Sequence, residues 1–184
     1  MNAILCRRPT PAEAEVLCAF AKHNIATSFP TFPADALEAY RKPWTQSVVL
    51  SRLTHRQDIL LVATVDDEII GLISGAAPEG GVGTIIWLFV DPRWRGRNAG
   101  RALYEAACGV YRELGAHKVK LTAPSEIAKR FYESCGMRVE GFHPHHWYNM
   151  DFYSLGAPLD CARDRLDHPQ RIAVEHPAST EHEP

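Results

Sequence analysis

The residues best suited to bind an anion are four closely spaced arginines, at positions 93, 95, 97 and 101, and the small residues among them, Gly96, Ala99 and Gly100. Guanidinium groups form paired hydrogen bonds to phosphate, and small residues let backbone N–H groups approach an anion closely. An apolar run over residues 84–90 precedes this segment, and an amphipathic pattern follows it from residue 99. A helix that begins here would present unpaired N–H groups and a partial positive charge. The pattern predicts an anion-binding turn between a strand and a helix, with a solvated basic turn as the alternative.

The charge balance of the whole chain narrows the kind of anion. The segment has neither the Gly-Lys-Ser/Thr of a Walker P-loop nor the three-glycine dinucleotide fingerprint. The chain carries 20 basic and 22 acidic side chains, which gives a formal net charge of −2. A near-neutral protein has no overall attraction to nucleic acid or to an anionic membrane, so we expect neither as a partner. A nucleic-acid-binding protein that uses the arginine cluster is a competing hypothesis, and it predicts steeply salt-dependent binding. The local patch favours a small polyanion.

A second feature lies downstream, at Tyr132. The apolar residues 127, 128, 131 and 132 recur at helical spacing, so Tyr132 falls on one face of a predicted helix. A phenol, with a pKa of about 10, stays protonated at neutral pH. These features alone favour a core tyrosine whose hydroxyl is hydrogen-bonded.

Periodicity and turn residues predict the elements that must position these groups. Strands are expected over residues 3–6, 59–65, 69–76, 84–90, 118–122, 138–142 and 147–153. Helices are expected over residues 11–24, 34–41, 45–53, 99–114 and 125–134. Residues 78–83, rich in Gly, predict a loop. This order predicts an α+β fold in which helices cover the faces of one sheet.

Length and composition predict a single domain and a cytoplasmic location. A chain of 184 residues that is 46% hydrophobic can bury one sizeable core, which we place in residues 1–158. Residues 159–184 are dominated by polar residues and Pro and predict a poorly ordered tail. The five cysteines include no CxxC pair, which favours a reducing compartment. The N-terminus has too short an apolar segment for a signal peptide, and no apolar run approaches the length of a membrane span.

Two motifs resemble those of a known family. Residues Arg95, Asn98 and Gly100 align with the pattern Arg/Gln-x-x-Gly-x-Gly/Ala of the GCN5-related N-acetyltransferase (GNAT) family, in its acetyl-CoA-binding segment. Residues 125–137 resemble a second pattern of that family, Asn-x-x-Ala-x-x-Phe-Tyr-Glu-x-x-Gly-Phe. The resemblance covers residues 60–155, and the N-terminal helices fit it by their order. It implies the acyl-CoA N-acyltransferase fold, with a mixed, mostly antiparallel central sheet flanked by helices.

The resemblance implies a role for each matched residue. The backbone groups of Leu88, Phe89 and Val90 would bind the pantetheine arm, which lies like an extra strand where two central strands separate. The pyrophosphate would be held by the backbone of the loop and of the helix start, which comprise Arg95, Gly96, Arg97, Asn98, Ala99, Gly100 and Arg101. Ser125 would contact the cofactor arm, and Tyr132 would protonate the leaving thiolate.

The sequence departs from the family pattern at three points. Asn98 replaces the first Gly of the loop, and asparagine tolerates left-handed backbone angles and caps helices. Ser125 replaces an Asn that contacts the cofactor arm in relatives, so this contact would be shorter or made through water. The strand over residues 84–90 contains no glutamate to act as a general base. The candidates for the base are Glu79, Glu126, His145, His146 or a chain of waters.

The resemblance implies an enzyme that transfers an acetyl group from acetyl-CoA directly to a primary amine of a protein or a small molecule. A CoA-binding GNAT-like module with a sensor or scaffold role and little transfer is the alternative, supported by Ser125 and the missing glutamate. We expect no metal, because residues 143–146 offer three histidines on one loop without further ligands at metal-binding spacing. The sequence leaves the acceptor and the oligomeric state open, with a homodimer as one option.

Overall fold

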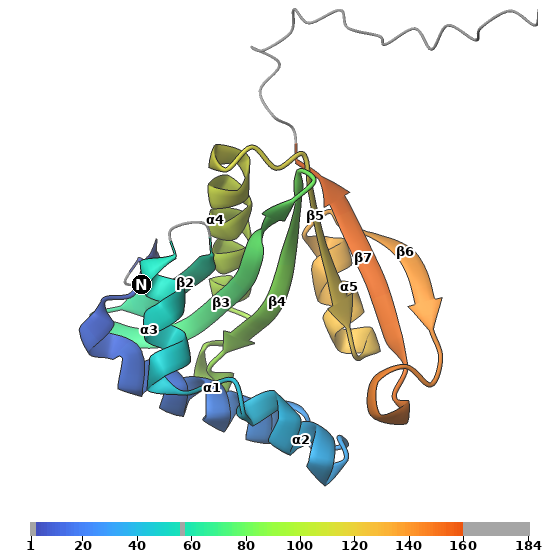
Figure 1. Ribbon diagram of the computed structural model, residues 1–184, viewed down its shortest axis with the longest axis horizontal. Helices are drawn as coiled ribbons and strands as arrows, with labels where there is room; N and C mark the ends of the chain where they lie inside the picture. Colours follow the sequence, from blue (N-terminus) through green and yellow to red (C-terminus); the bar gives the residue numbers. More distant parts are fainter. Residues whose placement is uncertain (1–2, 56–57, 160–184) are drawn as a thin grey trace, which may run out of the picture.

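A seven-stranded sheet forms the centre of the protein (Figure 1). The computed structural model describes residues 3–55 and 58–159, so the predicted tail lies outside the described residues except for Leu159. The strands are β1 (Leu5–Arg7), β2 (Ile59–Val65), β3 (Glu68–Glu79), β4 (Val82–Val90), β5 (Lys118–Ala123), β6 (Arg138–His143) and β7 (Phe152–Pro158). Their spatial order is β1-β2-β3-β4-β5-β7-β6, and every neighbouring pair is antiparallel except the parallel pair β4 and β5. The predicted mixed, mostly antiparallel sheet is confirmed.

Helices cover both faces of this sheet. On one face α1 (Ala14–Ser28), α2 (Ala34–Arg41) and α3 (Gln46–Thr54) pack on alternate residues of β2, such as Leu60 and Val62. On the other face α4 (Ala99–Glu113) and α5 (Glu126–Ser134) pack on a second cluster that includes Ile59 and Leu61. Both faces of β2 are therefore buried, which explains why its sequence is apolar except at Thr64.

The chain enters α1 through a 3-10 turn, Pro11–Glu13. The α-helix therefore begins at Ala14 and not at residue 11, where the sequence predicts its start. Glu13 accepts hydrogen bonds from the backbone N–H of Thr10 (2.7 Å) and from the Arg7 guanidinium (2.7 Å). This carboxylate therefore joins β1 to the start of α1. Helix α1 then extends to Ser28, four residues beyond the predicted end at residue 24.

Two predicted segments are wrong in their limits. Residues 78–83 form the end of a hairpin and not a loop, because β3 and β4 continue until Glu79 pairs with Val82. Gly80 and Gly81 have φ angles of +57° and +77°, and such a two-residue turn matches the twist of the flanking strands. The last strand begins at Phe152 and not at residue 147. The 3-10 segment Trp147–Asn149 occupies the preceding positions and includes left-handed φ angles that interrupt a strand.

Strands β4 and β5 separate along their length (Figure 1). Within the described chain, pairing between them runs only from Val82 opposite Lys118 to Thr84 opposite Lys120. The Tyr111 hydroxyl, on α4, donates to the Thr84 carbonyl (2.7 Å) and to the Ala76 carbonyl (3.1 Å), and so fixes the paired end. Residues 85–90 of β4 and 121–123 of β5 continue past this point without pairing to each other. The sheet is therefore open on one side of its centre.

Candidate active site

A groove with a volume of about 880 Å³ lies where β4 and β5 separate. Its walls come from β4, the turn after β4, the start of α4, α5 and the loop between β6 and β7. Eleven of the twelve predicted site residues line it: Leu88, Phe89, Val90, Arg95, Gly96, Asn98, Ala99, Gly100, Arg101, Ser125 and Tyr132. The structure thus brings two motifs that are distant in sequence to one cavity.

Strand β4 presents backbone groups to the groove. The register shifts between Ser74, opposite Trp87, and Gly75, opposite Ile85, so that Ile86 forms a bulge. A bulge bends a strand and leaves its extra residue unpaired. Beyond it, residues 88–90 pair with β3 on one side and face the groove on the other. This unpaired side could accept an extended ligand that carries amide groups.

The turn after β4 has the geometry of an anion site. Gly96 and Asn98 have φ angles of +71° and +66°, which place alternate residues in the left-handed region. Asn98 caps α4, and its carbonyl accepts the first hydrogen bond of the helix, from Ala102 (2.9 Å). The N–H groups of the next residues are left for a ligand. Asparagine at position 98 is therefore compatible with the turn, as the sequence predicts.

The arginines of this turn differ in what they contact. Arg95 donates to the Val90 carbonyl (3.2 Å) and to the Ser28 hydroxyl (2.9 Å), which links β4 to α1. Arg101 donates to the Ser134 carbonyl (2.7 Å) at the end of α5. The guanidinium of Arg97 lies over the ring of Trp94, 5.3 Å from its centroid, and Arg97 does not line the groove. Arg97 would therefore contribute its charge from outside the cavity.

Gly100 allows close contact between the first turn of α4 and α5. A Cβ atom at this position would lie 3.2 Å from the ring of Phe131 and 3.5 Å from a methyl group of Val90. The glycine therefore lets three elements meet beneath the anion-binding turn.

Helix α5 places Ser125 and Tyr132 in the groove. The Ser125 hydroxyl accepts a hydrogen bond from the Ala128 N–H (3.2 Å), so it caps its own helix. Tyr132 is 8% exposed and packs edge-on against Tyr104 and Phe131. Burial raises the pKa of Tyr132 above its ordinary value, and the nearby Cys135 thiol adds a smaller effect. The phenol is therefore held in its protonated form, as a proton donor requires.

The far end of the groove is aromatic, and its residues Phe29, Tyr40, Arg52 and Phe152 are not predicted from the sequence. Tyr40 of α2 contacts Trp87 edge-on (4.9 Å between centroids) and stacks on Trp147 (5.4 Å). Phe29 and Phe152 complete this aromatic wall. Arg52 of α3 also lines the groove. These residues come from separate elements, and their spacing in the sequence carries no signal of a shared site.

The proposed bases occupy different places. Among these four side chains, all within the described chain, His146 lines the groove and the other three do not. Glu79 lies at the hairpin of β3 and β4. Glu126 accepts hydrogen bonds from the Tyr153 hydroxyl and from Lys129. A ring nitrogen of His145 lies 2.9 Å from the Asn149 side-chain oxygen.

Sequence comparison decides the family. The model of the Acetyltransferase (GNAT) family matches residues 24–137, which is more than half of the chain. The chain belongs to the GNAT acetyltransferase family. The match contains the anion-binding turn and extends to the end of the second motif. A search of curated proteins finds no match.

Solved structures of GNAT proteins share this fold. A PaiA N-acetyltransferase from Thermoplasma acidophilum, in complex with coenzyme A, matches with a TM-score of 0.73 and 17% identity over 85% of this chain and 99% of that one. The ribosomal-protein-S18-alanine N-acetyltransferase from Escherichia coli matches with a TM-score of 0.67 and 14% identity, over 90% of this chain and 100% of that one. A spermidine N-acetyltransferase chimera from Vibrio cholerae matches with a TM-score of 0.66 and 16% identity, over 85% of this chain and 95% of that one. Identities this low establish the fold alone.

In residues 3–55 and 58–159, no helix is long and apolar enough to cross a membrane. The same residues contain no group of three or more His, Cys, Asp or Glu side chains that could hold a metal ion.

Proposed function

We propose that this GNAT protein transfers an acetyl group from acetyl-CoA directly to the primary amine of an acceptor. The observation that carries the proposal is that the anion-binding turn and the buried phenol of Tyr132 line one groove beside an unpaired stretch of β4. A pyrophosphate in the turn and an extended arm along β4 would bring a thioester towards Tyr132. The CoA complex of the structurally similar PaiA protein supports this donor.

The donor would be bound mainly by backbone groups. The N–H groups at the start of α4 suit the pyrophosphate, and Arg95 and Arg101 add positive charge beside it. Amide groups of the pantetheine arm would pair with residues 88–90 of β4. Such positioning of the thioester is expected to supply most of the rate enhancement.

The chemical step forms one bond and breaks another. The neutral amine nitrogen attacks the thioester carbonyl carbon, and the C–S bond breaks as the tetrahedral intermediate collapses. The thiolate takes a proton from Tyr132, and the nitrogen gives up a proton to a base. The products are the acetylated amine and CoA, with no covalent intermediate on the protein. A phenol whose pKa is raised by burial remains protonated throughout the neutral range.

We infer that His146 accepts the proton of the attacking amine. It lines the groove next to Trp147, at the end away from the anion-binding turn. Its ring lies edge-on to Phe152, with centroids 5.6 Å apart, and its backbone N–H donates to the Met150 carbonyl (2.8 Å). These contacts hold the imidazole at the mouth where an acceptor would enter.

A CoA-binding module with a sensor or scaffold role is the competing function. The observation that favours it is that the Ser125 hydroxyl accepts the capping hydrogen bond of α5, so that it has only its own proton left for a cofactor arm. Both functions predict an increase in melting temperature with excess acetyl-CoA. Only the enzyme releases free CoA when it is offered a panel of amines. Absence of a thermal shift would contradict both functions, and a shift without CoA release would favour the module.

A further inference from the structure

We propose that the acceptor is a small amine that also carries an aromatic side chain and a free carboxylate, as an aromatic amino acid does, and that Arg52 binds this carboxylate. The proposal rests on the acetyl-transfer function inferred above and specifies its substrate class. Its evidence is the position of Arg52, the charge of the groove and the aromatic wall.

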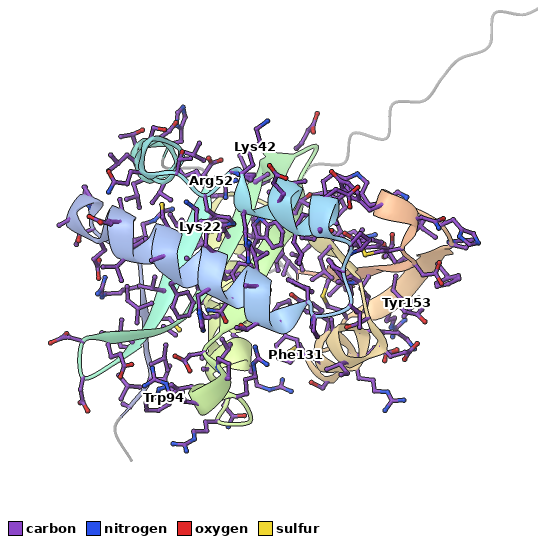
Figure 2. The ribbon with its side chains drawn as sticks, turned by 90° about the horizontal axis from the view of Figure 1, so that it is seen from below. Lys22, Lys42, Arg52, Trp94, Phe131 and Tyr153 are labelled. Carbon is purple, nitrogen blue, oxygen red and sulfur yellow. The ribbon has the colours of Figure 1, made fainter. Side chains whose placement is uncertain are left out.

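Arg52 reaches the groove from α3 at the level of Trp87. Its guanidinium donates to the hydroxyl of Ser74 (3.0 Å), a fully buried residue of β3 that lies opposite Trp87 in β4. In Figure 2, Arg52 lies between α3 and α2. Trp87 is three residues before Val90, so Arg52 is about 10 Å along the strand from the anion-binding turn. It is therefore placed at the acceptor end and not at the pyrophosphate end.

The positive charge of Arg52 is not neutralised by a carboxylate. No ion pair joins Arg52 to an acidic side chain of the described residues. The described residues that line the groove include Arg52, Arg95 and Arg101 but no Asp or Glu. The guanidinium instead lies 5.9 Å from the centroid of the Trp44 ring, which is 2% exposed. A guanidinium has five donors, and one beside apolar walls is best matched by a carboxylate of the ligand.

The aromatic wall supplies the second half of the match. Tyr40, Trp87 and Trp147 form a continuous set of rings, and Phe29 lies 6.2 Å from Tyr40. Rings of this kind bind a planar apolar group by stacking and edge contacts. The absence of Asp and Glu from the described lining disfavours polyamines and lysine-rich peptides, whose additional positive charges would face Arg52 without a carboxylate to bind them.

The test measures CoA release from acetyl-CoA with three probes: L-phenylalanine, L-phenylalaninamide and spermidine. The amide lacks the carboxylate and has the more readily deprotonated amine, so a preference for the free acid would come from recognition. We expect kcat/KM for phenylalanine to exceed that for the amide and for spermidine at least 10-fold. Arg52→Gln should lower kcat/KM for phenylalanine at least 10-fold, mainly by raising KM. The same substitution should change kcat/KM for phenylalaninamide less than 3-fold. Arg52→Lys should recover part of the preference.

Lys42→Gln is the matched control, because Lys42 is exposed at the end of α2 and projects away from the protein in Figure 2. It should retain the preference for phenylalanine. The thermal shift with acetyl-CoA should be the same in wild type and in both Arg52 variants, which verifies that each is folded and binds the donor. CoA release with the amide or spermidine equal to or faster than with phenylalanine would overturn the acceptor assignment and leave acetyl transfer intact. No thermal shift, or a shift without CoA release from any amine, would instead overturn the enzymatic function itself, and the acceptor with it.

Discussion

The indole of Trp147 stacks on the phenol ring of Tyr40, with centroids 5.4 Å apart and planes 24° from parallel. This contact joins the loop between β6 and β7 to α2 across the aromatic end of the groove. The loop has left-handed φ angles at His145, Tyr148 and Asn149, a conformation that non-glycine residues adopt at some cost. Trp147 is 52% exposed, whereas Tyr40 is 7% exposed. The stacking pair therefore bounds the aromatic end of the groove.

Trp147→Ala should weaken acceptor binding and leave donor binding unchanged. Removing the indole opens the aromatic wall, so we expect KM for the acceptor to rise about 5-fold, since a stacked aromatic pair adds about 1 kcal/mol beyond its buried area. The thermal shift with acetyl-CoA should stay at the wild-type value. Tyr148→Ala is the control, because this neighbouring ring does not line the groove. An unchanged KM in Trp147→Ala would contradict the placement of the acceptor.

Tyr132→Phe should lower turnover far more than donor affinity. The substitution removes the proton donor and keeps the ring that packs against Tyr104 and Phe131. We expect kcat to fall about 100-fold or more, which is typical of losing a general acid. Because burial raises the pKa of Tyr132, ionisation of this phenol should not lower wild-type turnover up to about pH 10.

Tyr104→Phe is the matched control for this prediction. Tyr104 is also buried, and burial raises its pKa as well, but it lies on α4 and does not line the groove. Its hydroxyl should be dispensable for turnover. If Tyr132→Phe turns over at the wild-type rate across pH, the acid role is wrong.

His146→Gln should lower kcat at least 10-fold at neutral pH if the imidazole accepts the amine proton. Gln keeps a polar side chain of similar size but cannot take up a proton. The control is His145→Gln, a change in the same loop at a side chain that does not line the groove. Equal activity in the two variants would remove His146 as the base and favour a chain of waters.

Gly100→Glu should abolish donor binding by placing a side chain and a negative charge in the anion-binding turn. We expect the affinity for CoA to fall at least 100-fold, measured by calorimetry. Gly109→Glu is the control on the same helix, where an added Cβ meets no atom within 4 Å. Since a side chain at position 100 also contacts Phe131, the melting temperature without ligand should be measured for both variants. Wild-type affinity in a folded Gly100→Glu protein would refute the location of the pyrophosphate.

Glu13 should make the fold sensitive to acid. Hydrogen bonds from Arg7 and from the Thr10 backbone lower the pKa of Glu13 to about 2. In the unfolded chain a glutamate has a pKa of about 4.3, so the stabilisation is complete above about pH 5 and is lost as the pH falls towards 2. We expect this loss to be about 1 kcal/mol, because both side chains are partly exposed to solvent.

The measurement for Glu13 is urea unfolding at about pH 6 and about pH 3. The wild type should lose about 0.5 kcal/mol more between these conditions than Glu13→Gln, because about half of the stabilisation is lost by pH 3. Glu15→Gln, at an exposed site on α1, should behave like the wild type. An equal acid sensitivity in wild type and Glu13→Gln would show that the contact with Arg7 adds no pH-dependent stability.

Sequence reasoning predicts this fold well where an element has one dominant signal. Strand β2 matches its predicted limits, residues 59–65, because a short, mostly apolar run rich in β-branched residues favours a strand buried on both faces. It fails where a turn is tighter than composition suggests, as at Gly80 and Gly81. It also fails where a run of aromatic residues predicts a strand that does not form, as at Trp147, which lies in a 3-10 segment before β7.

The sequence could predict that the turn after β4 shares one site with Tyr132, but it could not predict most of the aromatic end of the groove. The anion-binding turn is contiguous in sequence, so its spacing carries the signal of its geometry. Arg52, Tyr40 and Trp87 meet only because α2, α3 and β4 pack on one another. The side-chain position of Arg97 over Trp94 is likewise a packing result that spacing does not encode.

The parting of β4 and β5 gives the sheet a seam within its interior, where backbone groups of residues 85–90 lack a partner strand on one side. Pairing these groups with an amide-bearing arm would complete the sheet, so donor binding would contribute to the cohesion of the two halves of the protein. The protein would then resist unfolding and proteolysis more strongly as the concentration of acyl donor rises above its Kd.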